Sequence, residues 1–72
     1  MYVNIFAVFV EPFSSHNLYD EIKEYNVHVT DLIECTYAYG NILITDLERV
    51  IYIFLKFGVT RITFTITKDP SK

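Results

Sequence analysis

The sequence contains one cysteine, Cys35, among its 72 residues. A single thiol excludes an intramolecular disulfide framework and a structural zinc site built on cysteine ligands. A chain this short must then be held together by apolar packing, alone or with a partner. Hydrophobic residues make up 51% of it and aromatic residues 17%, far more than a disordered segment carries. We therefore predict one folded domain over residues 1–67 and a flexible tail over residues 68–72.

Long hydrophobic runs are also absent. The longest, at the N-terminus, is interrupted by Asn4 and ends at Glu11, well short of the ~18 to 20 residues of a membrane span. This run has no basic segment before it and no small-residue cleavage site after it, so we do not expect a secretory signal. With one cysteine and no signal, we expect a cytoplasmic protein, in the host cytoplasm if a phage encodes it.

The N-terminal third predicts a strand and a helix. Residues 2–10 are apolar on both alternating faces, which is typical of a central strand covered on both sides. A helix is expected next, because Leu18, Ile22 and Tyr25 recur at helical spacing. Asn17 is the expected N-cap, for its side chain can accept a backbone hydrogen bond. The alternative caps are Ser14 and Ser15.

The middle of the chain predicts a hairpin. Residues 27–37 are rich in Val, Ile and Thr and indicate a strand. The Ala-Tyr-Gly-Asn segment at residues 38–41 is typical of a turn, and residues 42–44 are expected to form a short returning strand.

The C-terminal third predicts a second helix and a last strand. Residues 45–48 form a capping-box pattern, and the helix is expected to end at Phe57 before a left-handed Gly58. Residues 59–67 then alternate between apolar and polar side chains, as in a half-buried strand. The core-facing residues expected there are Ile62, Phe64 and Ile66.

The order strand, helix, strand, strand, helix, strand indicates the α+β class. At this length we expect a ferredoxin-like βαββαβ sandwich, a four-stranded antiparallel sheet with two helices on one face. In that topology the first and third strands are central and the second and fourth are edges. Domains with this fold have many different activities, so the fold alone does not identify a function.

No catalytic or metal-binding constellation is recognisable. Cys35 lies in the predicted hairpin strand among apolar residues, typical of a buried small side chain and not of a nucleophile. His16 and His28 fall in different elements and have no third ligand at regular spacing. The acidic residues of the first predicted helix fit a solvated face better than a catalytic pair. We therefore expect no enzymatic activity, no metal and no cofactor.

Charge is segregated along the chain. Residues 1–48 hold eight acidic side chains against Lys23, a balance of −7, and residues 49–72 hold five basic side chains against Asp69, a balance of +4. In the predicted fold these halves include opposite edges of the sheet. Such edges can steer self-association or a charged partner. The alternative is a solvated surface on which the segregation is accidental.

The predicted sheet carries more apolar side chains than one layer of helices covers. Ala7 fits beneath a helix and Asn4 fits solvent, which sets the register of the first strand. An aromatic patch is then left on the opposite, open face, and such patches mark interfaces. The fourth strand adds a long edge without proline that favours pairing with another strand. The expected interface residues are Tyr2, Phe6, Val8, Arg61, Thr63 and Thr65.

These features predict a non-enzymatic protein-interaction module, a regulator or inhibitor of another protein. We expect a homodimer, joined through the open sheet face or the fourth-strand edge. The small size and acidic composition also suit a protein encoded by a phage or mobile element.

Single-stranded nucleic-acid binding is the first alternative. Tyr2 and Phe6 would stack on bases, while Arg49, Lys56 and Arg61 would contact phosphates. The two aromatic residues are only faintly similar to one half of the signature of RNA recognition motifs, and the basic, glycine-containing half is missing. A net charge of −3 also opposes this function.

A small-molecule-sensing regulatory domain is the second alternative. Polar groups for such a site would come from Glu11, His16 and Asn17, near the loop after the first strand. That loop lacks the glycine that would let its backbone approach a ligand closely.

Overall fold

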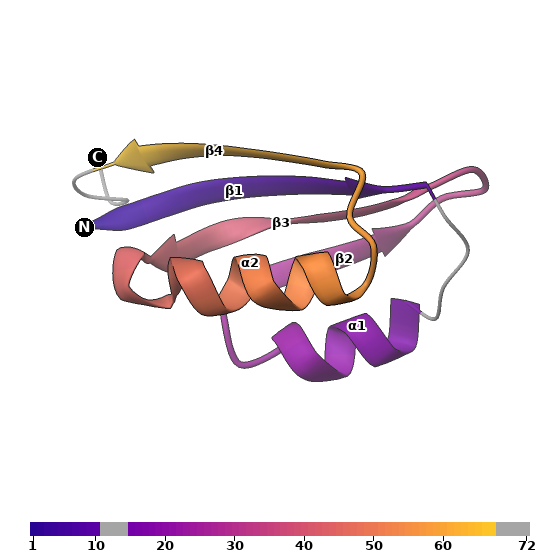
Figure 1. Ribbon diagram of the computed structural model, residues 1–72, viewed down its shortest axis with the longest axis horizontal. Helices are drawn as coiled ribbons and strands as arrows, with labels where there is room; N and C mark the ends of the chain where they lie inside the picture. Colours follow the sequence, from indigo (N-terminus) through magenta and orange to yellow (C-terminus); the bar gives the residue numbers. More distant parts are fainter. Residues whose placement is uncertain (11–14, 68–72) are drawn as a thin grey trace.

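A computed structural model describes residues 1–10 and 15–67 of the chain (Figure 1). Its elements are β1 (Tyr2–Phe9), α1 (Ser15–Ile22), β2 (Val27–Asp31), β3 (Thr36–Leu43), a 3-10 turn η1 (Ile44–Asp46), α2 (Leu47–Lys56) and β4 (Arg61–Thr67). The predicted order of strands and helices is confirmed. The tail predicted for residues 68–72 lies outside the described part. No helix within the described ranges is long and apolar enough to cross a membrane.

The four strands form one antiparallel sheet in the order β2-β3-β1-β4. The molecule is therefore an α+β domain, with β1 and β3 central and β2 and β4 at the edges, as predicted. In Figure 1 neither helix crosses β4. This uneven coverage decides which apolar side chains of the sheet are buried and which are left on the surface.

One side of the sheet, here called the core side, carries the buried side chains of the strands. On β1 every second side chain is buried: Val3, Ile5, Ala7 and Phe9. They form one cluster with residues of both helices, namely Leu18, Ile22, Val50, Ile53 and Phe54. The rings of Phe9 and Phe54 meet edge to face with centroids 5.6 Å apart, a favourable aromatic geometry. The predicted register of β1, with Ala7 inside and Asn4 outside, is confirmed.

The hairpin between β2 and β3 turns earlier than the sequence predicts. Its connection spans residues 32–35, where the N–H of Leu32 donates to the carbonyl oxygen of Cys35 at 2.8 Å. At the base of the connection the hydroxyl of Thr36 donates to the Asp31 carboxylate at 2.6 Å. The predicted turn at residues 38–41 is wrong, because these residues lie inside β3.

Gly40 is needed for a close approach of two backbones and not for a turn. A Cβ added there would lie 2.1 Å from the carbonyl oxygen of Asn26 and 2.8 Å from the Cα of Val27. A glycine inside a strand often marks such an approach. Gly40 therefore does mark a backbone constraint, as a glycine in this pattern suggests. The constraint is the close packing of residues 26 and 27, at the start of β2, and not a turn.

The predicted ends of the helices are partly right. Gly58, with φ of 77°, follows the C-cap of α2, so the predicted stop is confirmed. The predicted capping box is not formed: α2 follows a 3-10 turn, and its N-cap Asp46 makes no side-chain capping hydrogen bond. Asn17 lies inside α1, so it is not the N-cap, and Ser14 lies outside the described residues.

Candidate functional site

The side of the sheet opposite the core side, here called the open face, carries the predicted interface residues. In register across β3, β1 and β4, Tyr39 lies beside Phe6 and Phe6 beside Thr63. In the next row Val8 lies beside Arg61, and Asn4 and Tyr2 continue the same face. All six predicted residues therefore belong to one face: Tyr2, Phe6, Val8, Arg61, Thr63 and Thr65. No described helix or strand covers that face, and the Phe6 side chain remains 41% exposed.

Aromatic rings are paired across this face. Phe6 of β1 stacks on Tyr37 of β3 with centroids 5.3 Å apart. His28 of β2 lies beside Tyr39 of β3, with centroids 5.5 Å apart and the planes inclined by 39°. Together these four residues form a row of rings over β1, β3 and β2, here called the aromatic band: Phe6, Tyr37, Tyr39 and His28. Side chains that support one another in this way present a large apolar surface in a defined conformation.

Sequence analysis missed the part of this band that β3 supplies. Tyr37, Tyr39 and Asn41 alternate with residues that point to the core side, a period-two pattern typical of a strand. Because Gly40 is also typical of a turn, a turn was predicted at residues 38–41 in place of one continuous strand. The alternation was the sequence signal that could have identified Tyr37 and Tyr39 as surface residues.

Cys35 lies in the connection directly before β3 and contacts Tyr37 of the open face. Its side chain is half-buried, so the buried position that the sequence predicts is not reached. A side-chain hydrogen bond with Cys35 raises the pKa of Tyr37, and the charge of a Cys35 thiolate and some burial raise this pKa further. The phenol of Tyr37 is therefore held in its neutral, hydrogen-bonding form.

The basic residues of the nucleic-acid alternative are not brought together. Lys56 of α2 contacts Glu21 of α1, with Nζ and Oε1 2.6 Å apart, and Arg49 also lies on α2. Only Arg61 shares the open face with the aromatic band. The acidic and basic halves of the chain thus meet at the surface between the two helices.

The histidines do not form part of a larger polar cluster. His16 lies 3.6 Å from the carboxylate of Asp20 on the same helix, and His28 lies against Tyr39. Within the described ranges no three His, Cys, Asp or Glu side chains could hold a metal ion. Of the residues in the small-molecule alternative, Glu11 lies outside these ranges, while His16 and Asn17 are exposed on α1.

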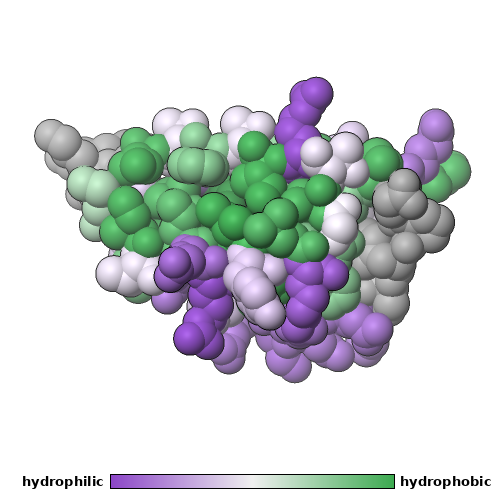
Figure 2. Space-filling model, in the orientation of Figure 1, coloured by the Kyte–Doolittle hydropathy of each residue, from purple (hydrophilic) through white to green (hydrophobic). Residues whose placement is uncertain are grey.

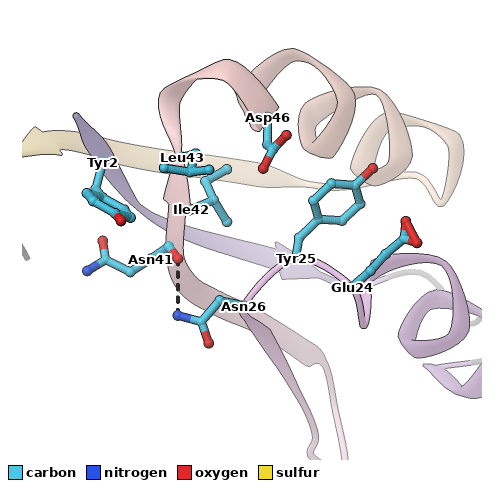
Figure 3. Close-up of a pocket in the computed structure, with 8 residues that line it drawn as sticks. All are labelled: Tyr2, Glu24, Tyr25, Asn26, Asn41, Ile42, Leu43 and Asp46. Carbon is cyan, nitrogen blue, oxygen red and sulfur yellow. Dashed lines mark hydrogen bonds between the residues drawn. The ribbon is translucent and has the colours of Figure 1, made fainter.

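A shallow pocket of about 280 Å³ lies where β3 extends beyond the end of β2 (Figure 3). Its lining residues are Tyr2, Glu24, Tyr25, Asn26, Asn41, Ile42, Leu43 and Asp46. The amide Nδ2 of Asn26 donates to the backbone carbonyl of Asn41 at 3.2 Å. The side-chain Oδ1 of Asn41 is buried and accepts no hydrogen bond from the described residues. The pocket combines carboxylates, amides and phenols, and the sequence analysis did not identify it.

The core side of β4 forms a second apolar surface. Ile62, Phe64 and Ile66 lie in register with buried residues of β1, as predicted, and Ile62 packs against the core. Phe64 and Ile66, however, remain 47% and 52% exposed, which contradicts the expectation that the whole stripe is buried. Leu55 of α2 is also exposed, and Figure 2 shows a broad apolar band across the middle of this view, with most of the hydrophilic side chains below it. Two short helices do not cover four strands.

Two surfaces thus stand out: the aromatic open face and the apolar edge formed by β4. Comparison with protein-family models, with curated proteins and with solved structures finds no match for this chain.

Proposed function

We propose that the protein is a small non-enzymatic interaction module that binds another protein through its open face and acts as a regulator or inhibitor of it. The observation that supports this function is the pair of ring contacts, Phe6 with Tyr37 and His28 with Tyr39, on a face that no described element covers. Rings that already stack lose little conformational freedom on binding.

The composition of the open face also suits a protein partner. Its centre is aromatic, and the β4 side is lined by Thr63, Thr65 and Arg61. Aromatic residues are enriched and charged residues depleted at the centres of protein interfaces, with polar groups around them. A second copy of the chain is one such partner, through the open face or the β4 edge.

The overall architecture is proposed to be a ferredoxin-like sandwich. The strand order β2-β3-β1-β4 and the βαββαβ chain order support this assignment. Both helices contribute to the one buried cluster on the core side. In that architecture the open face is the sheet surface left for binding.

Affinity purification with a matched pair of variants tests the function. Tyr39→Ser removes a ring from the open face, whereas Tyr52→Ser removes an exposed ring from α2. A partner that is retained by the wild type and by Tyr52→Ser, and lost from Tyr39→Ser, supports binding at the open face. Circular dichroism shows whether each variant is folded. Equal retention by both variants, or equal loss, contradicts the proposal.

Single-stranded nucleic-acid binding is kept as a second candidate because β1 and β3, the two central strands, both present rings on the open face. Bases stack on such rings in several sheet-based binding domains. Fluorescence anisotropy with labelled oligonucleotides at low salt tests this. Binding that Phe6→Ala and Tyr37→Ala both weaken supports it, and no binding at micromolar protein concentration excludes it.

A further inference from the structure

β4 is the longer of the two edge strands in the described sheet. It has seven residues, whereas β2 has five and ends at Asp31, whose carboxylate bonds to Thr36. An edge strand presents a row of unpaired backbone groups that can pair with another strand. Beyond Arg61, β4 contains no charged residue that would oppose such pairing.

The five central residues of β4 read the same in both directions around Phe64. They are Ile62, Thr63, Phe64, Thr65 and Ile66. Directly opposed residues of an antiparallel pair point to the same face of a sheet. A twofold axis perpendicular to the sheet must therefore lie midway between one residue of β4 and the same residue of the second copy, and Phe64 is the middle residue of the strand.

We infer that β4 pairs antiparallel with β4 of a second copy about a twofold axis midway between their two Phe64 residues, which joins the two sheets into one. In this register Ile62 lies opposite Ile66 of the second copy, and Thr63 lies opposite Thr65. Phe64 lies opposite its own counterpart. Cross-strand pairs of β-branched, Thr–Thr and aromatic side chains are each favourable. A donor strand of another sequence would not supply all of these pairs, so the palindrome favours a second copy as the occupant.

The exposed apolar side chains of β4 become contacts in this dimer. Phe64 and Ile66, which are about half exposed, pack against Phe64 and Ile62 of the second copy on the core side. The paired edge is about 24 Å long, from seven residues at a rise of ~3.4 Å each. With the seven residues of β4 on each side, this contact is smaller than a standard interface, which has about 20–30 residues a side. We therefore expect a dimer that dissociates in the micromolar range.

The charges within β4 itself do not oppose this contact. Arg61 lies opposite position 67, so the two Arg61 side chains are about 20 Å apart at opposite ends of the pair. That separation exceeds the Debye length of ~8 Å at physiological ionic strength. The acidic residues of α1, Asp20 and Glu21, make ion pairs with His16, Lys23 and Lys56 and do not lie on β4.

This inference rests on the proposed interaction function and identifies one partner for it, a second copy at β4. It leaves the open face of each copy accessible to another protein. The dimer and open-face binding can therefore fail independently of each other.

Substitutions that place charged side chains opposite each other across the proposed axis test the inference. Thr63 and Thr65 are exposed and lie opposite each other across the proposed axis. The double variant Thr63→Glu/Thr65→Lys creates two ion pairs between copies and is expected to lower the dissociation constant about fivefold. Thr63→Lys/Thr65→Lys creates two repulsive pairs and is expected to raise it at least about tenfold. Sedimentation equilibrium from micromolar to millimolar concentration measures both values.

The matched control places the same charges at exposed open-face positions that belong neither to β4 nor to the ring contacts, as Asn4→Glu/Thr30→Lys in β1 and β2. The dissociation constant is expected to stay at the wild-type value, because neither residue lies on β4. A monomeric wild type at millimolar concentration overturns the inference. It is also overturned by a dimer that both β4 variants leave unchanged, or that this control weakens; the last result would indicate dimerisation through the open face.

Discussion

The ring of Phe6 in β1 stacks on the ring of Tyr37 in β3, with 5.3 Å between centroids and 28° between planes. The contact joins the two central strands on the face away from the buried cluster. It therefore orders the open face without being part of the core. Stability measurements can distinguish these two roles.

Phe6→Ala is expected to lower the free energy of unfolding by about 1–2 kcal/mol, because a half-exposed ring loses one partner. Phe54→Ala should cost about 3–5 kcal/mol, since that ring is fully buried beside Phe9. Urea denaturation measures both. Equal losses for the two variants would show that the open-face ring has a core role.

Gly40→Ala is expected to destabilise the fold by about 3 kcal/mol, because the added Cβ would collide with the Asn26 carbonyl oxygen. Gly58→Ala is the matched comparison: it meets no atom within 4 Å but has a left-handed φ of 77°. It should cost only about 1–2 kcal/mol. Thermal unfolding of the two variants gives the ranking, and the reverse order would contradict the close approach at Gly40.

The hydrogen bond between Tyr37 and Cys35 makes stability depend on pH in the alkaline range. Because folding raises the pKa of Tyr37, the neutral phenol is favoured in the folded state. This stabilisation is fully present below the pKa of the unfolded chain and is lost as pH rises through the folded pKa. Cys35→Ala should bring the pKa of Tyr37 closer to that of an ordinary tyrosine.

Tyrosinate absorbance measures this pKa, and the Tyr37→Phe variant identifies which of the six tyrosines is responsible. Cys35→Ser, which keeps a hydrogen-bonding group, should preserve part of the upward shift. An unchanged titration in Cys35→Ala would mean that Cys35 does not control this phenol.

The ion pair between Lys56 and Glu21 is expected to contribute about 0.5 kcal/mol, because both side chains are partly exposed and salt screens them. Lys56→Met and Glu21→Gln, alone and together, form a double-mutant cycle that isolates the interaction. The coupling should decrease as salt is added. A salt-independent coupling above about 2 kcal/mol would contradict a surface ion pair.

Much of the fold could be predicted because local patterns report local structure. The apolar run of β1, the periodicity of the two helices and the stop at Gly58 each depend on a few neighbouring residues, and each predicted an element that is observed. The expectation that β1 is covered on both sides was wrong, because one of its faces stays open. The α+β class followed from their order. The placement of Phe6 and Thr63 on one face also followed, since strand periodicity assigns faces without knowledge of the partner strands.

The hairpin register and the surface of β3 could not be predicted in the same way. Gly40 resembles a turn residue in the sequence, but its role is to admit the backbone at Asn26, a contact between segments that are distant in the chain. With the turn moved to residues 32–35, Tyr37 and Tyr39 became members of the open face. The alternation of β3 does assign Tyr37 and Tyr39 to one face, but a turn at Gly40 can be excluded only from the backbone contact with Asn26, which no local pattern reports.

The sequence has one cysteine and 51% hydrophobic residues, which together imply a small domain held together by apolar packing. The sequence alone established which residues of β4 are apolar and that they share one side with the core. How far the helices reach across the sheet is a property of the packed molecule, and it leaves Phe64 and Ile66 at the surface. Periodicity specifies the direction of a side chain, whereas its burial depends on whether another element lies above it.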